Sequence, residues 1–241
     1  LGGARDFRER YEIPITRDRD SAVQARLARR VRPFLLRRVK REVAPDLPAR
    51  IEHVALCDLT PEQAAVYRQV LEAGRSEVLA AVGAQGLARS RMVVLTTLLR
   101  LRQVCCDLRL LDLPGLEAGA PSGKLDLFEE LLEEVVDGGH RALVFSQFTS
   151  MLALIRERLT AQGIEFCYLD GATADRGSVV QRFQGQPGIP VFLISLKAGG
   201  TGLNLTAADT VIHFDPWWNP AVEAQATDRA HRLGQTRVVT S

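Results

Sequence analysis

Short apolar runs alternate with amphipathic stretches over the second half of the chain, from about residue 122 onward. The apolar runs have the length of strands and contain few polar residues, which is typical of parallel strands buried on both faces. This alternation predicts an α/β fold in which helices cover both faces of a parallel sheet. The elements expected are strands at 142–146, 165–170, 191–195 and 210–215, and helices at 124–136, 149–163 and from 220 onward.

The pattern before residue 122 predicts a mainly helical region. A helical pattern over 20–43 contains Pro33, so we expect the helix to bend or split there. Thr60 and Gln63 have the spacing of a capping box, which begins a helix. The other elements expected are a strand at 49–59, a helix from 60 to about 82, a helix at 90–106 and a loop or linker at 112–123.

The composition is that of a globular protein: 46% of the 241 residues are hydrophobic and 25% are charged. This length suits one large domain, or one domain and part of another. No apolar run approaches the ~20 residues of a membrane span, and the basic N-terminal segment lacks the apolar stretch of a signal peptide. We therefore expect a soluble intracellular protein with no membrane partner.

Cysteine and histidine do not form a recognisable metal site in the sequence. The four cysteines have no C-x-x-C spacing, and the four histidines form no ligand motif. We expect buried thiols and no protein-bound metal.

The positive charge is concentrated near the beginning of the sequence. The net charge is only +2, but residues 1–50 hold 14 Lys and Arg against 7 Asp and Glu. A second arginine-rich run covers 88–109. The two runs together could follow a phosphate backbone, and each could equally be a solvated helix face.

Polar residues end all four of the strands expected after residue 122. In an open parallel sheet, ligands bind beyond the carboxyl ends of the strands. We interpret this edge as the candidate functional edge of the sheet. Its polar residues are Ser146 and Gln147, Asp170 and Gly171, Ser195 and Lys197, and Asp215.

A glycine-rich segment, SLKAGGTGLNL at 195–205, follows one of these strands. Closely spaced glycines let backbone N–H groups approach an anion, and they also serve a tight turn that needs positive φ. Both interpretations stay open. The residues available for ligand contacts are Gly199, Gly200, Gly202, Thr201, Asn204 and Lys197.

The segment EAQATDRAHRLGQ at 223–235 places Gln225, Arg229 and Arg232 at positions i, i+4 and i+7. On a continuous helix these side chains share one face. A guanidinium suits phosphate oxygens, and an arginine that reaches a γ-phosphate stabilises charge during transfer. The alternative is an exposed helix face that Glu223 and Asp228 balance.

The sequence lacks the phosphate-binding loop that such arginines would serve. The candidate GAPSGKL at 119–125 has three residues between its glycines where a P-loop needs four, and Leu125 stands where a Ser or Thr is required. No acidic D-E-x-H tetrad follows a strand either.

Six segments together resemble the SWI2/SNF2 family of ATPases, which are superfamily 2 translocases of double-stranded DNA. The C-terminal segments resemble the second motor lobe, and the upstream ones resemble the interlobe segment and part of the helical insertion. They are RPFLLRRVKREVAPDLPARIEHVALCDLTPEQ, LRQVCCDLRLL, VFSQF, YLDGAT, LISLKAGGTGLNLTAADTVIHFDPWWNP and QATDRAHRLGQ.

The resemblance implies a RecA-like fold, a three-layer α/β/α parallel sheet with a mainly helical N-terminal extension. ATP with Mg²⁺ would lie between two lobes, held mainly by a first lobe whose P-loop is not in this sequence. The implied domains are the C-terminal edge of lobe 1 with the linker at 1–50, the start of lobe 2 with a helical protrusion at 51–121, and the RecA-like C-terminal domain at 122–241. We expect this chain to be catalytically silent without lobe 1.

The resemblance also implies roles for individual residues. Arg232 would be the arginine finger, and Arg229 its partner on the phosphates. Gln225 and Gly200 would help to couple the nucleotide to DNA. The positions implied to contact DNA are Ser146, Gln147, Asp170, Gly171, Lys197, Thr201, Gly202 and Asn204.

Trp217, Trp218 and Asn219 resemble the family's coupling segment, although simple packing explains the tryptophans equally well. Asp228 stands where many helicases of the superfamily have glycine, which favours tracking along duplex DNA over strand separation.

The implied partners are double-stranded DNA and lobe 1 of the same polypeptide. In a bacterium, nucleoid DNA or transcription complexes would be further partners, and the protein would be in the cytoplasm or nucleoid. In a eukaryote it would be nuclear. A non-catalytic DNA-binding or docking module on a RecA scaffold is the alternative function. An RNA helicase lobe is a further one, which the R-L-G-Q ending disfavours.

Overall fold

The computed structural model describes residues 2–36, 44–111, 121–198 and 202–241. The chain divides into two compact units, Leu1–Asp46 and Leu47–Ser241.

The first unit is a small helical assembly around the buried side chain of Tyr11. The Tyr11 hydroxyl accepts a hydrogen bond of 2.8 Å from Nη1 of Arg30, and Asp20 caps the longest helix. This helix ends just before Pro33, as predicted, and continues as a short 3₁₀ turn. The elements are α1 (Ala4–Phe7), the π-helix η1 (Arg8–Glu12), α2 (Ile13–Thr16), α3 (Ser21–Val31) and η2 (Arg32–Phe34).

A six-stranded parallel sheet forms the centre of the second unit, in the order β1-β6-β5-β2-β4-β3. β2 lies between β4 and β5, with Ala142 opposite both Val191 and Thr210. Because all pairs are parallel, the carboxyl ends of the strands lie along one edge. The strands are β1 (Arg50–Ile51), β2 (Ala142–Ser146), β3 (Phe166–Leu169), β4 (Val191–Ser195), β5 (Thr210–His213) and β6 (Val239–Thr240).

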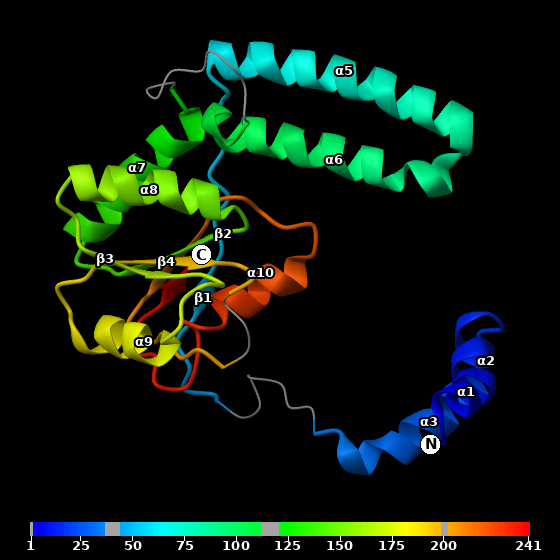
Figure 1. Cartoon of the computed structure of the whole chain (residues 1–241). Helices are drawn as coiled ribbons and strands as arrows, with labels where there is room; N and C mark the ends of the chain where they lie inside the picture. Colours follow the sequence, from blue (N-terminus) through cyan, green and yellow to red (C-terminus); the bar gives the residue numbers. More distant parts are fainter. Residues whose placement is uncertain (1, 37–43, 112–120, 199–201) are drawn as a thin grey trace. The chain divides into compact units, whose positions relative to one another are not determined.

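Helices cover both faces of this sheet, with α7 and α8 on one face and α9 and α10 on the other (Figure 1). Successive residues of a strand point to opposite faces, so the sheet has one hydrophobic core on each face. Val144 belongs to the core beneath α7 and α8, and Phe145 belongs to the core beneath α9 and α10. The predicted α/β fold is therefore confirmed. The helices are α7 (Gly123–Asp137), α8 (Thr149–Ala161), α9 (Arg176–Gly185) and α10 (Pro220–Thr227).

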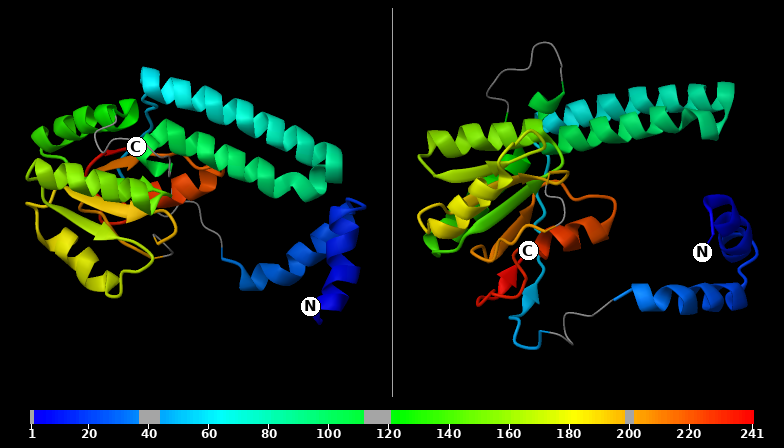
Figure 2. Two further views of the ribbon diagram at one scale, coloured as in Figure 1. Left: turned by 45° about the horizontal axis from the view of Figure 1, so that its top comes forward. Right: turned by 60° about the horizontal axis from the view of Figure 1, so that its bottom comes forward.

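Two long helices, α5 (Pro61–Gln85) and α6 (Leu87–Cys106), form an antiparallel hairpin that projects from the sheet region (Figure 2). The predicted capping box is present, because Gln63 N donates to Thr60 Oγ1 and Thr60 N donates to Gln63 Oε1, each at 3.2 Å. A Cβ at Gly74 would lie 2.3 Å from a methyl of Thr97, so glycine allows this close approach of the helices. The 3₁₀ turn η3 (Leu108–Leu110) follows the hairpin.

Two expectations for the segment before the hairpin are wrong. Only Arg50–Ile51 of the strand predicted at 49–59 is a strand in the structure, where these two residues pair with β6. Val54 and Leu56 are more than 80% exposed. Cys57 is exposed rather than buried, whereas Cys106 and Cys167 are buried and Cys105 is half-buried.

No helix in the described part of the chain is long and apolar enough to cross a membrane.

Candidate nucleotide and nucleic-acid site

The carboxyl ends of β2 and β5 meet through the buried carboxylate of Asp215. Gln147 N donates to both oxygens of Asp215, at 3.2 and 3.1 Å. Ser146 is buried, and its hydroxyl oxygen accepts a 3.0 Å hydrogen bond from Phe148 N. The side-chain nitrogen of Gln147 is buried and has no hydrogen-bond partner among the described residues. Gln147 is therefore the residue here with an unused donor.

Burial raises the pKa of Asp215 to about 6, against the lowering effects of the Ser146 hydroxyl, Gln147 N and the nearby Arg102 and Lys124. A carboxyl with this pKa changes charge close to neutral pH. The end of β5 is thus held by an acidic group that is costly to ionise.

Asp170 and Gly171 follow β3 in a tight turn. Ala172 N and Thr173 Oγ1 donate to Asp170 Oδ1, at 2.9 and 3.0 Å, and Tyr168 donates to Oδ2 at 3.0 Å. Although burial opposes the shift, these hydrogen bonds lower the pKa of Asp170. The carboxylate of Asp170 shapes the loop, and Gly171 is exposed beside it.

In the glycine-rich segment after β4, the structure describes residues 195–198 and 202–205. Lys197, Gly202 and Asn204 are exposed, and Gly202 has a φ of +100°, which favours glycine. Arg176, at the start of α9, donates to Ala198 O at 3.3 Å. Two further predicted site residues, Gly200 and Thr201, lie outside the described residues, as does Gly199.

The helix that carries Gln225 ends at Thr227, so the predicted single helical face of Gln225, Arg229 and Arg232 is wrong. The helix begins as expected, with Asn219 Oδ1 accepting a 3.0 Å hydrogen bond from Ala221 N. Beyond Thr227 the helical ladder is broken, although His231 N still donates to Thr227 O at 3.1 Å, and other groups bond the carbonyls that follow. The Arg229 carbonyl accepts from Leu205 N at 3.0 Å, and the Ala230 carbonyl accepts from Gln235 Nε2 at 3.2 Å.

The Arg229 side chain is a buried cation with unused donors. It is 8% exposed, its guanidinium lies 5.8 Å from the centroid of the Phe145 ring, and Nε and Nη1 have no hydrogen-bond partner among the described residues. Burial, and then the charge of Arg232, lower its pKa to about 10. The group is still charged at neutral pH, so it can bind an anion.

Arg232 and Gln225 are exposed, unlike Arg229. Nη1 of Arg232 donates to Leu203 O at 3.2 Å, which places this arginine beside the end of the glycine-rich segment. The structure therefore brings Arg229, Arg232 and residues 202–205 together, while Gln225 lies on the exposed surface of α10.

The Trp217–Trp218 segment lies between β5 and α10. Trp217 is 36% exposed and Trp218 is 62% exposed, and Trp217 N donates to Glu223 Oε1 at 2.7 Å. The guanidinium of Arg102, from α6, lies 5.4 and 5.1 Å from their ring centroids. Sequence reasoning missed Arg102, because no motif relates a residue of the helical hairpin to a segment more than 100 positions later.

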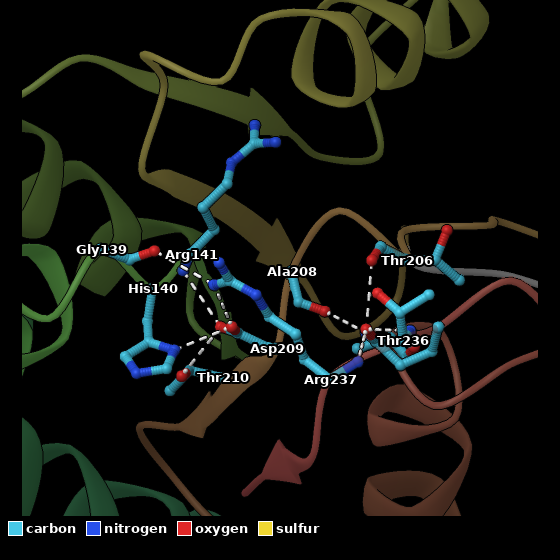
Figure 3. A network of polar contacts seen from close by, with 11 residues as sticks. Gly139, His140, Arg141, Thr206, Ala208, Asp209, Thr210, Thr236 and Arg237 are labelled. Carbon is cyan, nitrogen blue, oxygen red and sulfur yellow. Dashed lines mark hydrogen bonds and ion pairs between the residues drawn. The ribbon is translucent and has the colours of Figure 1, made fainter. Parts of the chain in front are cut away.

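The opposite edge of the sheet carries a polar network that sequence reasoning also missed (Figure 3). The buried carboxylate of Asp209 accepts hydrogen bonds from Arg141 N at 3.1 Å and Arg237 Nη1 at 2.9 Å, and pairs with His140 Nδ1 at 2.8 Å. Gln235 Nε2 donates to Ala208 O at 2.8 Å. These contacts fix residues 235–237 beside a hollow of about 520 Å³ and so hold the segment that follows Arg232.

Within the described ranges, no three His, Cys, Asp or Glu side chains are grouped closely enough to hold a metal ion. The guanidinium groups of Arg229 and Arg232 have the charge and the donors that suit the phosphates of a nucleotide.

Comparison with known proteins identifies the family. Residues 1–110 match the SNF2-related domain, and residues 123–234 match the helicase conserved C-terminal domain. The solved C-terminal domain of the Sulfolobus solfataricus SWI2/SNF2 ATPase is 36% identical, with a TM-score of 0.63, over 73% of this chain and 76% of that one. The chain belongs to the SWI2/SNF2 family. This confirms the resemblance drawn from the motifs, and the RecA-like fold with it.

Two of the other relatives extend the likeness over nearly the whole chain, and a third matches about half of it. The ATPase core from S. solfataricus, solved with double-stranded DNA, is 36% identical with a TM-score of 0.68, over 100% of this chain and 50% of that one. A putative ATP-dependent helicase/translocase of Bacillus subtilis, YwqA, is 39% identical over 99% of this chain and 26% of its own length. The chromatin-remodeling ATPase INO80 of Emericella nidulans is 55% identical over 49% of this chain and 8% of its own length. The chain thus spans about a quarter or less of these curated relatives.

Proposed function

We propose that this chain is the second motor lobe of an ATP-dependent translocase of double-stranded DNA. Residues 122–241 would form the lobe, 51–121 its beginning with the helical protrusion, and 1–50 the edge of lobe 1 with the linker. Two facts support the proposal: membership of the SWI2/SNF2 family, and the double-stranded DNA bound to the related S. solfataricus core.

The observation that carries the proposal is the buried guanidinium of Arg229, whose Nε and Nη1 lack partners among the described residues. Burying an unpaired cation is costly, so such a group is expected to gain an anionic partner when the protein acts. The exposed guanidinium of Arg232 adds a second positive charge beside it. Two adjacent arginines suit the terminal phosphates of ATP.

In the proposed mechanism, ATP provides the bond whose hydrolysis drives movement, and lobe 1 holds ATP and Mg²⁺. Arg232 would stabilise the negative charge that develops on the γ-phosphate, because its guanidinium is exposed and can exchange the Leu203 carbonyl for a phosphate oxygen. Arg229 is held in place by Phe145 and stays desolvated, so its charge acts strongly over a short distance. Gln225 and Gly200 would pass the nucleotide state to the DNA contacts.

The DNA backbone would lie along the carboxyl edge of the sheet. Lys197, Gly202 and Asn204 are exposed at the end of β4, and Gln147 has an unused amide donor. Asp170 would act by shaping its turn, since hydrogen bonds already occupy its carboxylate. The other proposed DNA contacts are Ser146, Gly171 and Thr201, with Trp217, Trp218 and Asn219 as the coupling segment.

The test is DNA-stimulated ATP hydrolysis by the intact protein that carries Arg232→Ala. We expect kcat to fall about 10³-fold, the size of effect that an arginine finger has on phosphoryl transfer. Arg182→Ala is the matched control, since Arg182 is exposed on α9 and lies beside Glu165, just before the amino end of β3. Activity near that of the wild type would reject the finger assignment, and an intact protein without DNA-stimulated hydrolysis would favour the non-catalytic docking module.

A second measurement tests the phosphate site in the 241-residue chain itself. We expect pyrophosphate to raise the urea midpoint of the wild type and not that of Arg229→Met. In the absence of pyrophosphate, Arg229→Met should be the more stable protein by about 1–3 kcal/mol, because it no longer buries an unpaired charge. Equal responses of both proteins to pyrophosphate would contradict the proposed role of Arg229.

A further inference from the structure

Arg102 lies near the C-terminus of α6, at the base of the α5–α6 hairpin. This base is firmly joined to the rest of the unit. Gln63 Nε2 donates to Val104 O at 2.8 Å, and Ser122 Oγ donates to Cys106 O at 2.7 Å. A side chain at position 102 therefore extends from a fixed support.

The guanidinium of Arg102 contacts the segment between β5 and α10. Nη2 donates to Pro216 O at 2.7 Å and lies 3.8 Å from Asp215 Oδ2. The guanidinium carbon is 5.4 Å from the Trp217 ring centroid and 5.1 Å from that of Trp218. An arginine that served only to complement the helix end would face the last carbonyls of α6. This one is directed to a different segment of the chain.

The same guanidinium also contacts the segment that follows β2, because the Phe148 ring centroid lies 5.8 Å from it. Gln147 N is bonded to Asp215, so the segments after β2 and β5 both lie against one side chain of α6. The side chain of Arg102 is only 18% exposed, whereas Trp218 is 62% exposed. The two tryptophans are not among the buried core residues of the sheet, and the guanidinium of Arg102 lies over both of their rings.

We propose that Arg102 is a positioning residue that joins the α5–α6 hairpin to the Trp217–Trp218 segment and to the ends of β2 and β5. These parts then move as one body when the lobe acts on DNA. The proposal deepens the proposed translocase function and rests on it for the effect on movement, though not for the contact itself. Lysine would not replace this arginine fully, since an ammonium group cannot stack on two indole rings and bond a carbonyl at once.

The contact is tested by tryptophan fluorescence of the 241-residue chain, whose only two tryptophans are Trp217 and Trp218. Arg102→Met keeps the aliphatic stem and removes the stacked charge. We expect its acrylamide quenching constant to rise about twofold, because the two indoles lose their cover. Arg100→Met, at an exposed position of the same helix, is the control and should quench like the wild type.

Arg102→Lys serves as a second variant if Arg102→Met does not fold, and it too should quench more than the wild type. Quenching at the wild-type level in a folded Arg102 variant would overturn the proposal. An equal increase in Arg100→Met would overturn it as well.

The effect on movement is tested in the intact protein by a triplex-displacement assay, in which a translocating protein removes a third strand from duplex DNA. The quantity measured is the amount of third strand displaced per ATP hydrolysed. We expect Arg102→Met to keep DNA-stimulated hydrolysis within about twofold and to displace about tenfold less strand per ATP, with partial recovery in Arg102→Lys. A proportional loss of both activities would contradict the positioning role. A wild type without DNA-stimulated hydrolysis would refute the translocase function, and the fluorescence result would still decide whether Arg102 holds the tryptophans.

Discussion

Asp215, at the carboxyl edge of the sheet, lowers the stability of the folded state when its carboxyl is ionised. Its carboxyl is 3% exposed, and burial raises its pKa from 3.8 to about 6. Between these two values the folded state binds a proton that the unfolded state has released. Stability therefore falls as the pH rises through this window, and the loss is complete above about pH 6.

Replacing Asp215 with asparagine should remove this pH dependence. The amide keeps an oxygen that can accept from Gln147 N and never ionises. We expect the free energy of unfolding of the wild type, relative to Asp215→Asn, to fall by about 3 kcal/mol between pH 3.5 and pH 7.5. Urea unfolding of both proteins across this pH range measures the difference between their free energies of unfolding. The other carboxyls titrate alike in the two proteins, so their contributions cancel in this difference. A constant difference would show that Asp215 is not the titrating group.

Residue identity was easier to predict than residue environment. The resemblance pointed to Arg229 and Arg232 by motif, but only the fold shows that Arg229 is buried over Phe145 and that Arg232 is exposed. Burial depends on which distant strand passes beneath a side chain. Spacing within a helix cannot supply that information, and the same limit applies to Arg102 and its tryptophans.

At the scale of elements, local chemistry predicted the beginnings of helices better than their ends. Thr60 with Gln63, and Asn219 with Pro220, cap their helices as expected because capping uses neighbours in sequence. After α10, Leu205 N comes from the segment before β5 to bond the Arg229 carbonyl, and the chain folds back so that Gln235 bonds the Ala230 carbonyl. The first of these contacts is long-range, so neighbours in sequence do not predict it. Of the four strands expected after residue 122, β2 and β4 were the most predictable because their apolar runs are continuous and buried on both faces, whereas β3 and β5 are partly exposed.

Gln63 joins three elements, so its loss should loosen the base of the α5–α6 hairpin. Its side chain is fully buried, donates to Val104 O, and accepts from Thr60 N and Gly123 N. Gln63→Met would leave these backbone groups without a partner, at a cost of about 2–4 kcal/mol. Urea unfolding measures this loss, and hydrogen exchange should quicken first near Val104. The exposed Gln69→Met is the control, and a similar small effect for both variants would contradict the structural role of Gln63.

At the scale of the whole molecule, the net charge of +2 is too small to attract DNA by itself. Affinity for a polyanion must then come from cations at particular places. In the proposed function, the relevant place is the carboxyl edge of the sheet, where Lys197 is exposed next to the glycine-rich segment.

This distribution predicts how salt should act on DNA binding by the intact protein. Each phosphate contact contributes about 0.9 to the slope of log affinity against log salt concentration. We expect Lys197→Ala to reduce the magnitude of that slope by about 1 and to weaken binding to all duplex sequences alike. Arg182→Ala, with its charge on exposed α9, should leave the slope unchanged. Fluorescence anisotropy with a labelled duplex over a range of salt concentrations gives both slopes. If the Arg182 variant changed the slope and the Lys197 variant did not, DNA would have to lie on the α9 face, and the carboxyl edge would lose its proposed role.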